Sequence, residues 1–187
     1  MFLQNAHDPT TVSPTAAFEA EALPHMNDLF RSAVRMFQDH GKASDAVQEV
    51  YLIAWKSFGK YERGSNCKAW LFQILFNVVR HDRRNWFKWI TGKEEDLAEA
   101  QLIAPVPIPD ALTDGTILAA LDKLPAQFRE ALLLVDVEDF SYKEASEILQ
   151  VPIGTIMSRL NRARGLLRTQ LADVARSYGI YGGRVAS

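Results

Sequence analysis

The stretch SYKEASEILQVPIGTIMSRLNRARGLLR, residues 141–168, decides the fold of this chain. Ser141 is a suitable N-cap, and Glu144 three residues later can complete a capping box. Pro152 ends this first helix, because proline pushes the residue before it out of the α region. A second helix opens at Gly154. A short helix joined by a tight turn to a longer one predicts a helix-turn-helix, whose second helix enters the major groove of DNA.

The second helix of this unit has an apolar face and a basic face. The apolar positions recur at steps of three and four, as in a helix packed on a core: Ile156, Leu160, Ala163 and Leu167. Five arginines are opposed within residues 153–176 by Asp173 alone: Arg159, Arg162, Arg164, Arg168 and Arg176. A helical hairpin with a solvated arginine face is the alternative interpretation. The clustering of the arginines favours DNA binding.

The formal net charge of −2 hides two basic segments. Residues 60–93 contain eight Lys or Arg against two Asp or Glu, and residues 151–187 contain six against one. Between them, residues 94–114 hold six acids and no Lys or Arg. The alternation predicts two separate surfaces that can bind nucleic acid.

Length and composition indicate a globular intracellular protein. The chain has 187 residues, of which 48% are apolar, enough for one large domain or two small ones. It has no run of about 18 apolar residues that could span a membrane. Its start lacks the basic and apolar segments of a secretory signal. Cys67 is the single cysteine and cannot form an intrachain disulfide.

Helical periodicity dominates the first half of the chain. Apolar residues at steps of three and four predict helices over residues 15–22, 24–39 and 68–86. Gly41 is expected to end the second of these, and Ser44 to cap a further helix. Strand-like alternation is not found, so the predicted fold class is all-α.

Composition divides the chain into two small helical domains. Residues 91–113 are acidic and then proline-rich, with APVPIPD near their end, which indicates a flexible linker. The expected segments are a disordered N-terminus at 1–13, a first domain at 14–90, the linker at 91–113, a second domain at 114–174 and a C-terminal tail at 175–187. Two predicted helices, over residues 114–124 and 125–137, precede the helix-turn-helix.

Two faces of the first domain carry candidate binding residues. The helix after Ser44 has a polar stripe around an exposed leucine, either a solvated face or a protein-binding one: Asp45, Gln48, Glu49, Leu52 and Lys56. On the helix over residues 68–86, amides and guanidiniums at helical spacing share a face that can contact phosphates and base edges: Gln73, Asn77, Arg80 and Arg84.

Aromatic residues lie near this basic face: Tyr61, Phe72, Trp86, Phe87 and Trp89. Bases of single-stranded nucleic acid stack on such rings. Ordinary packing in the core and linker explains the same residues equally well. The sequence leaves both interpretations open.

Four motifs in series resemble one known family. They are DAVQEVYLIAW at residues 45–55, KAWLFQILFNVVRHDRR at 68–84, LDKLPAQFREALLLVDVEDFSYKEASEIL at 121–149 and VPIGTIMSRLNRARGLLR at 151–168. Together they resemble the extracytoplasmic-function (ECF) group of bacterial sigma-70 family sigma factors. The resemblance implies a region 2 bundle and a region 4 helix-turn-helix. It also implies binding to core RNA polymerase and recognition of the −10 and −35 promoter elements to start transcription.

The resemblance also implies roles for single residues. The face that docks on the β′ clamp helices of the polymerase would comprise Asp45, Gln48, Glu49 and Leu52. The −10 element would be bound, with a flipped base held by the loop over residues 61–67, by Tyr61, Asn66, Gln73, Asn77, Arg80, Arg83 and Arg84. The −35 element would be contacted by Thr155, Ser158, Arg159, Arg162, Arg164 and Arg168, the last two on phosphates.

Partners follow from the same resemblance. They are core RNA polymerase, through its β′ clamp helices and β flap, promoter DNA and an anti-sigma factor. The chain is expected to be a monomer when free, without membrane insertion, and to lie in the cytoplasm or be held at the inner membrane by the anti-sigma factor. No cofactor, metal or enzymatic activity is expected, since no catalytic constellation stands out and His25, His40 and His81 are scattered.

Two alternative functions would require different sequence features. A sigma-like mimic, which binds an anti-sigma protein without binding DNA, is the alternative, and it would be expected to lose the arginines that this chain retains. A helix-turn-helix repressor would need a dimerisation element and would leave the helix over residues 45–55 without a use.

Several positions depart from the family pattern. His81 stands where the family usually has Asp, and Met157 replaces a common lysine. Gln150 occupies the position at which glycine normally takes the left-handed turn, a strain of about 1 kcal/mol. These departures are expected to alter promoter preference and to leave the fold intact.

Overall fold

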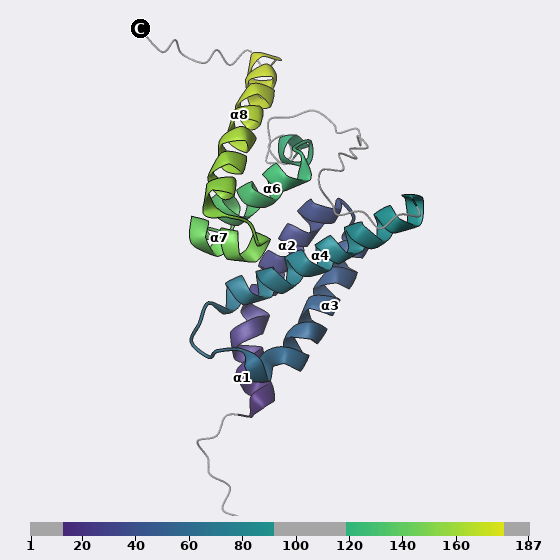
Figure 1. Cartoon of the computed structure of the whole chain (residues 1–187), viewed down its shortest axis with the longest axis vertical. Coiled ribbons are helices and arrows are strands. Elements are labelled where there is room, and N and C mark those ends of the chain that lie inside the picture. The colour runs from purple at the N-terminus through teal and green to yellow at the C-terminus, as the bar shows by residue number, and fades with distance from the viewer. Residues whose placement is uncertain (1–12, 92–118, 178–187) are drawn as a thin grey trace, which may run out of the picture.

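The computed structural model describes residues 13–91 and 119–177, and every regular element in these two ranges is helical (Figure 1). The predicted all-α fold class is confirmed. Residues 1–12 of the expected N-terminal segment at 1–13, nearly all of the expected linker and the end of the C-terminal tail lie outside these ranges. The side chains of Trp86, Phe87 and Trp89 are not described either.

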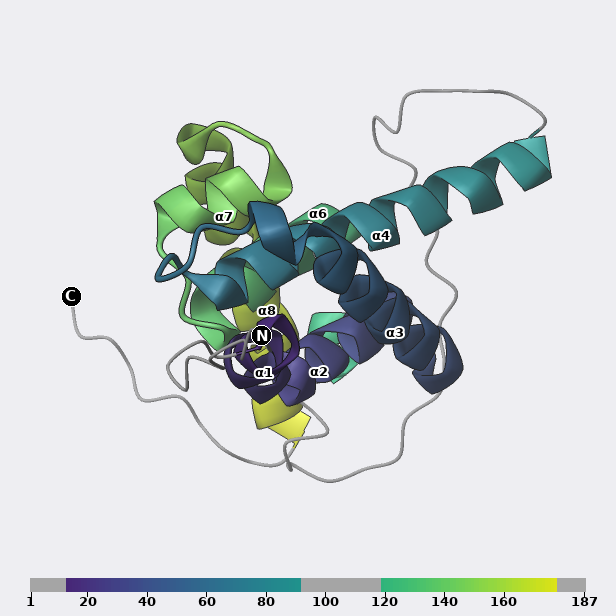
Figure 2. The ribbon, with the colours of Figure 1, turned by 90° about the horizontal axis from the view of Figure 1, so that it is seen from below.

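The first lobe is a bundle of helices in which α2, α3 and α4 pack on one another (Figures 1 and 2). Its elements are α1 (Pro14–Ala22), η1 (Leu23–His25), α2 (Met26–Phe37), α3 (His40–Ser57), η2 (Phe58–Lys60) and α4 (Cys67–Thr91). Leu29, Val50, Leu71 and Leu75 are fully buried at its centre. Each such side chain contributes about 1.5–3 kcal/mol by leaving water. The far end of α4 projects beyond the bundle (Figure 2).

The boundary between α2 and α3 differs from the one predicted. Gln38 takes the left-handed conformation, with φ 54° and ψ 27°, and ends α2 three residues before Gly41. Asp39 then caps α3, because its Oδ1 accepts a hydrogen bond of 3.0 Å from the backbone N–H of Lys42. The predicted end at Gly41 and start at Ser44 are therefore wrong. The aspartate cap offsets the cost of about 1 kcal/mol for a glycine inside the helix.

The second lobe contains the helix-turn-helix. Its elements are α6 (Ala126–Leu132), the π-helical turn η3 (Leu133–Val137), α7 (Tyr142–Leu149) and α8 (Ile153–Ser177). The predicted left-handed turn at Gln150 is confirmed, with φ 56° and ψ 43°. Ile156, Leu160 and Ala163 are buried, as the apolar face of α8 predicts.

The predicted capping box at the start of α7 is also confirmed. The backbone N–H of Glu144 donates to Ser141 Oγ at 3.2 Å, and the backbone N–H of Ser141 donates to Glu144 Oε2 at 2.9 Å. Both bonds satisfy donors that a helix start would otherwise leave unpaired.

Ser141→Ala is expected to lower the free energy of unfolding by about 1 kcal/mol at neutral pH. Hydrogen bonds from the Ser141 side chain and backbone lower the pKa of Glu144. The contribution of this carboxylate is therefore fully present above its ordinary pKa of 4.5 and is lost as the pH falls through the lower folded-state value. Urea unfolding should show the difference from wild type shrinking in acid. Thr169→Ala, on an exposed part of α8, is the control and should change stability by less than about 0.5 kcal/mol.

The two lobes lie against each other, with α7 packed on α4 (Figures 1 and 2). Phe72 of α4 and Phe140, just before α7, meet edge to face with ring centroids 5.1 Å apart. Both rings are buried. The first lobe thus shares an apolar contact with the lobe that carries the helix-turn-helix.

Candidate nucleic-acid interface

The candidate polymerase-binding residues lie on the outward face of α3. Asp45, Gln48, Glu49 and Leu52 are all exposed, and Leu52 exposes 60% of its surface. An apolar groove of about 640 Å³ adjoins this face, where Gln48 lines it together with Tyr51 and Trp55. An exposed leucine next to an apolar groove is typical of a protein-binding surface.

The basic face of α4 is already in contact with the second lobe. Asn77 and Arg84 are exposed, whereas Gln73, Arg80 and Arg83 are partly buried. Arg80 Nη1 donates to Gln150 Oε1 at 2.9 Å, and Arg83 forms an ion pair with Glu130 of α6. The structure therefore gathers the predicted residues on one helix and covers part of them.

The loop over residues 61–66 is held by aromatic packing. Tyr61 is 9% exposed, and its ring stacks on those of Trp70 and Phe58 at centroid distances of 4.7 and 5.7 Å. Its hydroxyl donates to the backbone carbonyl of Ser65 at 2.9 Å. Burial raises the pKa of Tyr61. In this arrangement Tyr61 and Phe72 are core residues, and their rings are not open to a base.

Asn66 links the loop to both lobes. Its Oδ1 accepts a hydrogen bond of 3.0 Å from the backbone N–H of Ala69, which caps the start of α4. Its Nδ2 donates to Glu144 Oε1 of the second lobe at 2.6 Å. The side chain that the family resemblance assigns to the −10 element is thus held by a carboxylate.

The candidate −35 residues occupy the N-terminal two-thirds of α8. Ser158, Arg162 and Arg168 are exposed, and Thr155 and Arg159 are partly exposed. Arg164 differs from the others, because Asp136 holds it through two hydrogen bonds, from Nη2 to Oδ1 at 2.6 Å and from Nε to Oδ2 at 3.0 Å.

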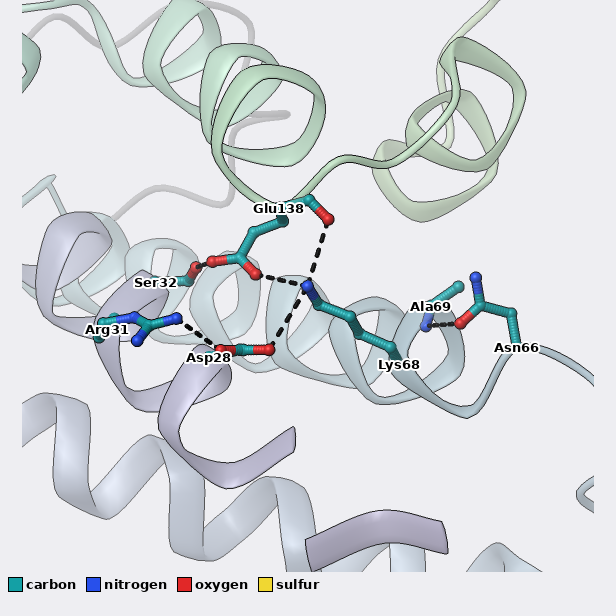
Figure 3. Close-up of polar contacts among 7 residues, drawn as sticks. All are labelled: Asp28, Arg31, Ser32, Asn66, Lys68, Ala69 and Glu138. Atoms are coloured by element: carbon teal, nitrogen blue, oxygen red, sulfur yellow. Dashed lines mark hydrogen bonds and ion pairs between the residues drawn. The ribbon is translucent and has the colours of Figure 1, made fainter. Parts of the chain in front are cut away.

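A polar cluster between the lobes was not predicted from the sequence (Figure 3). Glu138 of the second lobe accepts a hydrogen bond of 2.9 Å from Ser32 Oγ and pairs with Lys68 Nζ at 2.8 Å. Lys68 Nζ also lies 3.4 Å from Asp28 Oδ2. Burial acts to lower the pKa of Lys68, but the hydrogen bond and charge of Glu138, with those of Asp28, raise it overall. Glu138 lies in an acidic turn, and no pattern in the sequence predicts that it is buried.

Metal and membrane sites are not found among the described residues. Within residues 13–91 and 119–177, His, Cys, Asp and Glu side chains form no group that could hold a metal ion. In the same part of the chain, each helix is too short or too polar to cross a membrane.

Two family models match the two lobes. Residues 23–87 match sigma-70 region 2, and residues 114–167 match sigma-70 region 4. The chain is also 36% identical over 167 residues to the ECF RNA polymerase sigma factor EcfG of Rhodopseudomonas palustris, covering 88% of this chain and 91% of that protein. The chain belongs to the ECF group of sigma-70 family sigma factors. It is a factor that directs RNA polymerase to promoters, and it is not an enzyme.

Solved structures show how this ECF sigma factor compares in three dimensions. The sigma factor RpoE of Bartonella quintana, crystallised with the anti-sigma factor NepR, aligns with a TM-score of 0.68 and 34% identity, covering 83% of this chain and 96% of that one. CnrH, whose structure was solved in complex with the cytosolic domain of CnrY, aligns with a TM-score of 0.59 and 21% identity, covering 86% of this chain and 90% of that one. The second likeness shows the shared fold alone.

Proposed function

We propose that this ECF sigma factor binds core RNA polymerase through α3, the −10 element through α4 and its preceding loop, and the −35 element through α8. One observation carries the proposal: Asp45, Gln48, Glu49 and Leu52 are exposed on α3, whereas the exposed residues predicted to bind DNA lie on other helices, α4 and α8. Polymerase and promoter can therefore be bound at the same time.

The α3 face has the character of a protein-binding surface. Leu52 is exposed among polar residues. Trp55 lines the adjoining groove, and 45% of its surface is exposed. Interfaces of this kind place an apolar anchor inside a polar rim. We assign this face to the β′ clamp helices of the polymerase.

The two DNA contacts use different chemistry. On α8, Arg159 and Arg162 can reach base edges in the major groove, where a bidentate arginine reads guanine. On α4, the helix that follows the loop at residues 61–66, Asn77 and Arg84 are exposed. Moving a base out of the stack costs a few kcal/mol of free energy. Contacts between the base and such a loop must offset this cost. Tyr61 would support this loop from the core of the first lobe, because its ring is buried.

Further partners follow from the family. The β flap of the polymerase is the expected contact of the second lobe. An anti-sigma factor is the expected regulator, supported by the 34% identical RpoE that was crystallised with NepR. The free factor would be a cytoplasmic monomer, held at the inner membrane only where its anti-sigma factor is anchored there.

Separate loss of the two functions tests these assignments. Arg159→Ala should weaken binding to −35 duplex DNA by 1–3 kcal/mol, roughly 5- to 150-fold, and leave polymerase binding unchanged. The double variant Asp45→Ala, Gln48→Ala should do the reverse. Fluorescence anisotropy with promoter duplex and with labelled core polymerase measures both. Equal loss of both activities in either variant would contradict the assignment.

A further inference from the structure

Two large apolar side chains are exposed at the start of α8, the helix proposed to bind the −35 element. Ile153 exposes 42% of its surface and Met157 exposes 51%. They are four residues apart, so they lie on the same face of the helix, one turn from each other. The N-terminal residues of the second helix in a helix-turn-helix are the ones that contact base edges. The exposed pair therefore lies at the end of α8 that would meet the bases.

The pair lies beside the apolar face that packs α8 on its own lobe. Ile156 and Leu160 on that face are buried. Met157 follows Ile156 by one position and is therefore turned about 100° away from it around the helix axis. Ser158, a predicted −35 residue, follows on the other side and is exposed. Met157 thus lies at the edge of the face that is proposed to bind DNA.

Two of the predicted −35 residues use hydrogen-bonding groups within the chain itself. Ser158 Oγ donates to the backbone carbonyl of Thr155 at 3.0 Å, so its hydroxyl proton is directed back into the helix. Arg164 is held by Asp136 through two hydrogen bonds. Hydrogen bonds from these two side chains to DNA would first have to replace the bonds within the chain. An apolar contact with a base has no such cost.

The major groove of DNA offers an apolar group for such a contact. Base edges there present hydrogen-bond donors and acceptors, and thymine adds a C5-methyl group that apolar side chains contact. The unbranched side chain of methionine has three rotatable bonds and adapts its shape to the group it packs on. Exposed arginines on the same helix, Arg162 and Arg168, favour DNA over an apolar protein surface as the partner.

We propose that Met157, supported by Ile153, determines specificity by packing on the C5-methyl group of one thymine in the −35 element. The inference rests on the proposed function, since it requires α8 to lie in the major groove of that element. A lysine at this position would instead bind phosphate, which carries no direct sequence information. Met157 therefore adds a preference for thymine at one position of the promoter.

Removal of single methyl groups from the DNA tests this contact. The protein is the full-length chain assembled with core RNA polymerase, and the DNA is a promoter fragment with the two motifs that its mapped transcripts share. Each thymine of the −35 motif, on both strands, is replaced in turn by deoxyuridine, which pairs in the same way but lacks the methyl group. Competition against a fluorescent promoter fragment gives the ratio of the two dissociation constants. This ratio is independent of any change that a variant causes in overall affinity.

One of the thymines should bind about fourfold more weakly when it is replaced by deoxyuridine, which corresponds to about 0.8 kcal/mol for one buried methyl group. Met157→Ala and Met157→Lys should abolish this difference, and Met157→Leu should retain most of it. Leu166→Ala is the matched control, because it shortens another exposed apolar side chain further along α8, of which 40% is exposed. It should leave the fourfold ratio unchanged.

Three results would overturn the thymine contact. They are a −35 motif without thymine on either strand, equal binding of thymine and deoxyuridine DNA at every position, and a ratio that Met157→Ala leaves unchanged. If any of them occurs while Arg159→Ala still weakens −35 binding, the role of Met157 is refuted and the proposed function stands. If the chain directs core polymerase to no promoter at all, the proposed function and this contact are refuted together.

Discussion

Phe72→Ala is expected to lower the free energy of unfolding by about 3–5 kcal/mol. The ring of Phe72 is fully buried and touches that of Phe140 edge to face, so its loss opens a cavity in the first lobe and removes a contact with the second. Aromatic pairs of this geometry add about 0.5–1.5 kcal/mol beyond burial. Urea unfolding followed by circular dichroism measures the loss.

Two further variants separate the cavity from the contact between lobes. Phe72→Leu keeps most of the apolar volume and should cost clearly less than Phe72→Ala. Phe140→Ala removes the partner ring from the other side. If the rings couple the lobes, the loss in the double variant should fall short of the sum of the single losses by about 0.5–1.5 kcal/mol. Additive losses would show that the two rings do not couple the lobes.

Leu52→Arg is expected to weaken binding to core RNA polymerase by about 2–4 kcal/mol, or roughly 30- to 1000-fold. Leu52 is the most exposed large apolar side chain of the described residues, and it is the apolar member of the α3 face. A charge introduced at an apolar contact of an interface would have to be buried without a partner. Competition with labelled wild-type protein for core polymerase measures the change.

Folding should be unaffected by this substitution, because the side chain is in water. Val137→Arg is the matched control, since Val137 is 51% exposed and lies in the second lobe, away from the α3 face. The two variants should unfold within about 0.5 kcal/mol of wild type. If Leu52→Arg bound polymerase as well as Val137→Arg does, the α3 face would not be the docking surface.

Local signals predicted the helix-turn-helix closely. The capping box needs only Ser141 and Glu144, three residues apart, and the end of α7 follows from the backbone restriction at Pro152. Both ends of α7 are therefore determined by a short stretch of sequence. The turn at Asp39 was misplaced for a related reason. Residues that can cap a helix lie close together there. The sequence does not reveal that Asp39, rather than Ser44, caps α3.

Contacts between the lobes cannot be predicted from such local signals. Ser32 and Glu138 are 106 positions apart, and periodicity says only that each lies on a helix or a turn. The burial of Tyr61 is a similar case. Its stacking on Trp70 depends on how η2 turns toward α4, which aromatic composition does not reveal. The sequence therefore predicts which faces bind and leaves open which of them are covered.

The most direct test of the account is transcription by the purified chain with core RNA polymerase on fragmented genomic DNA, with the 5′ ends of the RNA mapped. The account predicts transcripts that require the chain and share two upstream motifs, one for each lobe. Co-elution with polymerase without transcripts would contradict the assignment of the two DNA faces. Absence of both transcripts and co-elution would contradict the sigma function itself.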